Sequence, residues 1–123
     1  MILLSIILIT IASVSESVMD TLAHHYETSF FVKFNPYFWN PVLSGSNKWK
    51  NGSKKQGEKF FLSSTLLVGF TEGWHLFKMI RTFCLFAAIG VLEYEFNKTI
   101  YLSVILRVVF GLIFTVFYKK FQN

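Results

Sequence analysis

Two pairs of ionisable side chains, each on a predicted helix, could do chemistry in this chain. Asp20 and His24 are four residues apart, and Glu72 and His75 are three apart. Because residues three or four apart share one face of a helix, each pair would present a carboxylate and an imidazole together. That ligand set suits a divalent metal such as Zn, or Fe or Mn. These four residues are therefore candidate metal ligands, and a metal-activated water could hydrolyse a substrate there.

Each pair also has a purely structural interpretation. The solvated end of a helix that has left the lipid could explain Asp20, His24, His25 and Glu27. Trp74 with His75 could anchor a helix at the membrane surface. Neither spacing is specific, because both patterns are frequent by chance and the His-Glu-x-x-His motif of zinc hydrolases is absent. The sequence therefore identifies no catalytic residue and leaves open whether the protein is an enzyme.

The composition indicates which kind of fold must position these residues. Of the 123 residues, 53% are hydrophobic and 19% aromatic, and the mean hydropathy is +0.47. The apolar residues come in long blocks rather than in the short alternations of strands. We therefore predict a single all-α domain that is an integral membrane bundle of about three transmembrane helices. A soluble protein with a phenylalanine-rich core is the alternative.

The first and last predicted spans are long apolar runs. Residues 2–24 follow a start without any charge, and residues 99–118 are the clearest span in the chain. A cleaved signal peptide is the alternative for the first run, with Ser13 to Ser15 as the cleavage site. No Lys or Arg precedes the run, and this favours a retained helix.

The middle of the apolar sequence, residues 60–96, allows two arrangements. In the first, residues 60–73 form a re-entrant or surface segment and residues 74–95 form a span, because a run of 10–14 apolar residues is too short to cross a bilayer. In the second, two short spans are separated by a tight turn near Lys78–Arg81. The distribution of charge favours the first arrangement.

A basic, aromatic loop, residues 33–59, separates the first two spans. It contains a single carboxylate, Glu58, against six lysines: Lys33, Lys48, Lys50, Lys54, Lys55 and Lys59. Three spans would place this loop and Lys119–Lys120 on one side, which the positive-inside rule makes cytoplasmic. We therefore expect a multi-pass protein of the inner or plasma membrane with a cytoplasmic C-terminus. Its loop would contact anionic lipid headgroups, and no nucleic-acid motif accompanies the lysines.

A stripe of polar side chains runs along the first helix. Its members fall within about 80° of one another at helical spacing: Ser13, Ser17, Asp20, His24 and Glu27. Polar groups on one face of a membrane helix normally face other helices or a wet cavity. The polar stripe therefore predicts that helices assemble through this face.

The leading functional prediction is a small membrane protein that acts through helix assembly as a homo-oligomer, forming a pore or permeabilising the membrane. A short chain with several spans and a basic tail resembles the general design of holins and other small membrane-permeabilising proteins. This resemblance is one of architecture and covers no defined stretch. The alternative is a membrane-embedded metal-binding protein or metal-dependent hydrolase that uses Asp20, His24, Glu72 and His75 at the cytoplasmic boundary.

Overall fold

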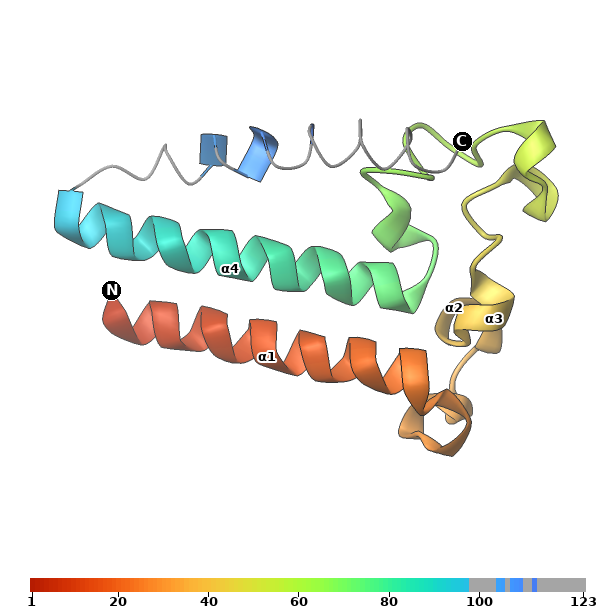
Figure 1. Ribbon diagram of the computed structural model, residues 1–123, viewed down its shortest axis with the longest axis horizontal. Coiled ribbons are helices and arrows are strands. Elements are labelled where there is room, and N and C mark those ends of the chain that lie inside the picture. The colour runs from red at the N-terminus through yellow and green to blue at the C-terminus, as the bar shows by residue number, and fades with distance from the viewer. Residues whose placement is uncertain (98–103, 106, 110–111, 113–123) are drawn as a thin grey trace. The chain divides into compact units, whose positions relative to one another are not determined.

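The computed structural model describes residues 1–97, 104–105, 107–109 and 112. Two long helices, α1 (Ile2–His24) and α4 (Gly73–Asn97), are joined by a segment of short helices and turns (Figure 1). The part of the chain that the structure describes is helical and contains no strand. The predicted all-α class is confirmed for this part. The predicted third span, 99–118, lies mostly outside the described residues, and those of it that are described are helical.

Both long helices are long and apolar enough to cross a membrane. The apolar stretches run over Ile2–His24, with 23 residues, and Gly73–Tyr94, with 22 residues. At 1.5 Å per residue each stretch is roughly 33–35 Å long, which matches a hydrocarbon layer of about 30 Å. α4 continues through Lys78–Arg81 without a break, so the alternative of two short spans with a turn there is wrong.

The structure divides into two compact units. One is Val14–Ile80, and the other is the described part of Met1–Ser13 with Arg81–Asn123. Each unit contains part of both long helices. The unit Val14–Ile80 also contains the whole connecting segment, and it holds the predicted pairs at residues 20, 24, 72 and 75.

Four short helices follow α1 in this unit. They are two 3₁₀ helices, Tyr26–Thr28 and Phe30–Lys33, and two one-turn α-helices, α2 (Pro36–Trp39) and α3 (Pro41–Ser44). Asn35 and Asn40 each accept a hydrogen bond through Oδ1 from the backbone N–H two residues later, at 3.0 and 2.9 Å. Proline then occupies the first helical position, where no backbone N–H is needed. Both Asn-Pro pairs, which predict turns, therefore begin helices.

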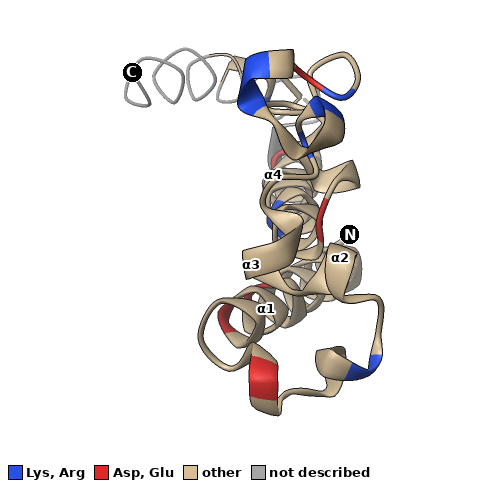
Figure 2. Ribbon diagram, turned by 90° about the vertical axis from the view of Figure 1, so that its right-hand side faces the viewer, with Lys and Arg blue, Asp and Glu red and all other residues tan. Residues whose placement is uncertain are grey.

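Residues 48–59 form a hairpin, called the basic hairpin below. The backbone N–H of Lys59 donates to Lys48 O, and that of Lys50 donates to Gly57 O, both at 3.0 Å. Between these bonds lie two 3₁₀ helices, Lys50–Gly52 and Lys54–Gln56, and Gly52 and Gly57 have positive φ values of 72° and 85°. Five of the six lysines of the loop lie on this hairpin, and Figure 2 shows blue ribbon gathered there.

The segment between the basic hairpin and α4 consists of turns and a 3₁₀ helix, Val68–Phe70. Ser63 is fully buried, and its hydroxyl donates to Lys48 O at 2.8 Å. This contact ties the segment to the hairpin. Residues 60–72 form no continuous helix.

Close packing at the start of α4 leads to a testable prediction. A Cβ atom on Gly73 would lie 2.9 Å from Cε3 of Trp39, and the indole is itself stacked on Phe31 with 5.0 Å between ring centroids. We expect Gly73→Ala to lower the free energy of unfolding in detergent micelles by about 1 kcal/mol, because the steric cost exceeds the gain in helix propensity. In a Trp39→Leu background, where the indole is absent, Gly73→Ala should leave the free energy of unfolding unchanged. An equal loss in both backgrounds would contradict this packing.

Candidate functional site

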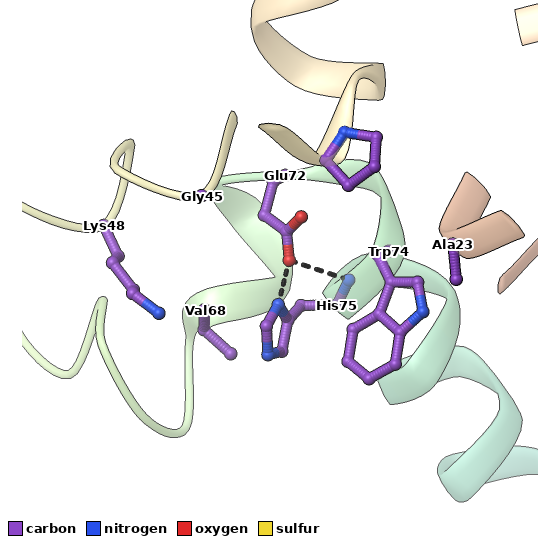
Figure 3. Close-up of a pocket in the computed structure, with 8 residues that line it drawn as sticks. Ala23, Gly45, Lys48, Val68, Glu72, Trp74 and His75 are labelled. Carbon is purple, nitrogen blue, oxygen red and sulfur yellow. Dashed lines mark hydrogen bonds and ion pairs between the residues drawn. The ribbon is translucent and has the colours of Figure 1, made fainter. Parts of the chain in front are cut away.

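A pocket of about 360 Å³ lies in the unit Val14–Ile80 (Figure 3). It is lined by one residue of α1, several of the connecting segment and two of the first turn of α4: Ala23, Pro41, Gly45, Lys48, Val68, Glu72, Trp74 and His75. The walls are mostly apolar, and the ionisable groups are a carboxylate, an imidazole and an ammonium. One of the two predicted pairs, Glu72 and His75, therefore lies in a pocket.

Glu72 caps the N-terminus of α4. Its Oε1 accepts a hydrogen bond from the backbone N–H of His75 at 3.1 Å, and its backbone carbonyl accepts from Leu76 at 3.1 Å. A side-chain acceptor at this position satisfies an N–H that has no partner within the helix, and a carboxylate is favourable at the positive end of the helix dipole. The sequence spacing of Glu72 and His75 thus has a structural cause besides any chemistry.

Two residues of the connecting segment hold this helix start in place. Ser44, at the end of α3, is buried and donates a hydrogen bond from Oγ to Glu72 Oε2 at 3.3 Å. Asn47 donates from Nδ2 to Thr71 O at 3.0 Å and also contacts Tyr37 O. The Glu72 side chain is only 7% exposed, and both oxygens of its carboxylate have donors.

The imidazole of His75 is oriented by the same carboxylate. Its Nδ1–H donates a hydrogen bond to Glu72 Oε1, so that the ring's other nitrogen, Nε2, is an acceptor (Figure 3). The Ser44 hydroxyl donates to the carboxylate and not to the imidazole, so the order hydroxyl, imidazole, carboxylate of a serine hydrolase is not formed. Among the described residues, the site therefore contains no hydroxyl that is activated by the imidazole.

Lys48 lines the pocket from the basic hairpin and extends toward His75 in Figure 3. Burial, together with the nearby ammonium of Lys54, lowers the pKa of Lys48. Its Nζ lies 6.0 Å from the centroid of the Trp49 ring, and it forms no ion pair with a carboxylate of the described residues.

The other predicted pair lies on an exposed face of α1. Asp20 and His24 are exposed, as are Ser13 and Ser17, so the part of the polar stripe on α1 faces outward. Glu27 is also exposed, but α1 ends before it and Glu27 lies in the 3₁₀ helix Tyr26–Thr28, so the stripe is shorter than predicted. The residues of α1 that are buried, Ser15, Met19 and Leu22 among them, lie about 130° around the helix from the stripe.

The structure does not bring the four predicted metal ligands together. Glu72 and His75 are in contact, but the described residues include no group of three or more His, Cys, Asp or Glu side chains that could hold a metal ion. The physical reason is the rotation of α1, which turns Asp20 and His24 outward. Because the described part of the chain forms no such centre, the prediction of a shared metal site has no support in the geometry.

Sequence reasoning missed two polar residues of the site: Lys48, which lines the pocket, and Ser44, which donates to the Glu72 carboxylate. Ser44 stands in a Ser-Gly-Ser run that predicts only a turn, and Lys48 is one of six lysines that are equivalent in the sequence. No local pattern marks either residue, because their positions depend on contacts with residues distant in the chain, Ser44 with Glu72 and Lys48 with Ser63.

Comparison with known proteins identifies no relative of this chain. No protein-family model matches the chain, and no curated protein and no solved structure matches it.

Proposed function

We propose that this chain is a small integral membrane protein whose copies assemble through α1 into a pore or another membrane-permeabilising oligomer. The observation that carries the proposal is the exposed apolar surface of the two long helices. Only 22% of each apolar stretch is buried within the chain. Large apolar side chains that are exposed include Ile2, Leu3, Ile6, Ile7 and Val14 on α1, and Phe83, Leu85 and Ile89 on α4.

The amount of this surface favours lipid as its surroundings. Exposing apolar surface to water costs roughly 25 cal/mol per Å², and soluble monomers rarely expose contiguous apolar patches of more than about 600 Å². Hydrocarbon removes that cost without any further protein contact. Since both helices also have the length of a membrane span, insertion accounts for length and exposure together.

The polar stripe supports assembly within the membrane. The Asp20 carboxylate forms no hydrogen bond or ion pair with the residues that the structure describes. A carboxylate on the lipid-facing side of a helix is unfavourable by about 2.5–3.5 kcal/mol at the centre of a bilayer and by less near its surface. A second copy offers the complementary group, because Asp20 and His24 lie one turn apart and can pair with His24 and Asp20 of the other copy.

The lysines suggest the orientation. The basic hairpin lies between the two candidate spans, and an excess of lysine in a short loop places it on the cytoplasmic side. There it would contact anionic headgroups. A cytoplasmic C-terminus requires one more crossing, by residues 99–118, which lie mostly outside the described part of the chain.

Reconstitution tests this function. We expect the protein to remain in the membrane pellet after extraction with alkaline carbonate and to release a small dye from liposomes. Because a pore needs several copies, leakage should rise more steeply than in proportion to the number of copies per liposome. Protein in the carbonate supernatant would rule out membrane insertion, and insertion without leakage or chemical cross-links between copies would rule out a permeabilising oligomer.

A further inference from the structure

We propose that the pocket beside the start of α4 binds the phosphate group of an anionic phospholipid, with Lys48 as its cationic contact. The inference rests on the proposed function only in requiring that α1 and α4 enter the membrane. Such a pocket would bind one lipid at a defined place, whereas the basic hairpin as a whole would attract anionic headgroups only by its charge.

The position of the pocket matches the level of lipid headgroups. Ala23 belongs to the last turn of α1, and Trp74 and His75 belong to the first turn of α4, and all three line the pocket. The pocket therefore lies where both candidate spans leave the hydrocarbon. Trp74 is at the depth where amphipathic indole rings are most favourable, and its ring has the Lys78 ammonium 5.0 Å from its centroid.

Lys48 is the one lysine of the basic hairpin that lines the pocket. The other lysines of the hairpin, Lys50, Lys54, Lys55 and Lys59, are exposed and do not line it. Lys48 is partly buried, and its ammonium has no carboxylate partner among the described residues. A phosphate in the pocket would supply the missing negative charge and offset the burial and the repulsion from Lys54 that disfavour the ammonium.

The Glu72 carboxylate does not prevent an anion from binding there. Its oxygens already accept hydrogen bonds from Ser44 and from the backbone N–H of His75, and its charge lies at the positive end of α4. With Nδ1–H of His75 donating to the same carboxylate, Nε2 of the neutral ring is an acceptor, which can take a hydrogen bond from a hydroxyl of the headgroup but makes no contact with the phosphate oxygens. The apolar walls, among them Pro41 and Val68, suit the glycerol and upper acyl carbons next to the phosphate.

The test compares two lysine variants of the full chain. Wild-type protein in non-ionic detergent is mixed with phosphatidylglycerol or phosphatidylcholine, and retained lipid is measured by native mass spectrometry. We expect preferential retention of phosphatidylglycerol, a loss of about fivefold in that preference for Lys48→Met, and a change of less than about twofold for Lys55→Met. Lys48→Arg keeps the charge and should keep the preference, which separates the contact from any effect on folding.

Other outcomes would overturn the proposal. Equal losses in Lys48→Met and Lys55→Met would mean that the hairpin attracts lipid by its total charge alone. Protection of the protein against thermal unfolding by inorganic phosphate, but not by phosphatidylglycerol, would assign the pocket to a soluble anion. Wild-type protein that resists carbonate extraction but shows no preference for phosphatidylglycerol would overturn the pocket site only. Wild-type protein that is soluble in carbonate would overturn the proposed function.

Discussion

Replacing His24 with leucine is expected to weaken association between copies of this protein in liposomes by about threefold to twentyfold. The range corresponds to the loss of one hydrogen bond between helices inside a membrane, which is worth about 0.6–1.7 kcal/mol. His24 is exposed on α1 one turn from Asp20, so a partner helix can reach both groups. Association is measured by energy transfer between labelled copies, and dye leakage should fall with it.

His25 provides the matched control. It is the neighbouring imidazole and is also exposed, but it lies off the polar stripe and follows the last residue of α1. We expect His25→Leu to associate like the wild type and Asp20→Leu to resemble His24→Leu. If Asp20→Leu and His24→Leu both associate as well as the wild type, the polar stripe is not the contact between copies.

The Glu72→Ala substitution should lower the free energy of unfolding in detergent micelles by about 2 kcal/mol. It removes the cap of α4 and leaves the buried hydroxyl of Ser44 and the backbone N–H of His75 without their acceptor. The first turn of α4 would then fray, and because Trp74 and His75 in this turn line the pocket, the pocket would lose part of its wall. Circular dichroism during a denaturant titration measures the change.

Glu27→Ala tests whether the loss of stability in Glu72→Ala comes from the removal of a buried cap rather than from the removal of a charge. Glu27 carries the same carboxylate in an exposed position, so its removal should change stability by less than about 0.5 kcal/mol. Glu72→Gln, which keeps an acceptor oxygen, should lose less stability than Glu72→Ala. Equal effects at positions 27 and 72 would show that the cap contributes nothing of its own.

Local sequence predicted the long helices well. The expected first span, 2–24, coincides with the observed α1, Ile2–His24, and the observed α4, Gly73–Asn97, contains the expected span 74–95. Long apolar runs without proline favour a helix in hydrocarbon, because each backbone group there must find its hydrogen-bond partner within the same segment. The Asn-Pro pairs were harder to interpret, because the same two residues suit a turn and the first positions of a helix.

The sequence by itself determined the helical class of the described residues, the positions of the two long helices and the gathering of lysines in one loop, and its third predicted span, 99–118, lies mostly outside those residues. Only the tertiary structure decided which face of α1 is buried. The sequence singled out the polar stripe as a face for contact with other helices, but within the described chain that stripe is exposed. Apolar residues cover the rest of the helix, so periodicity could not show which of them are buried, and the small Ser15 is buried while Val14 is exposed. The tertiary structure also brought Ser44 and Lys48 to Glu72 and His75. Contacts between residues so far apart in the chain depend on how the connecting segment folds back, which no local pattern records.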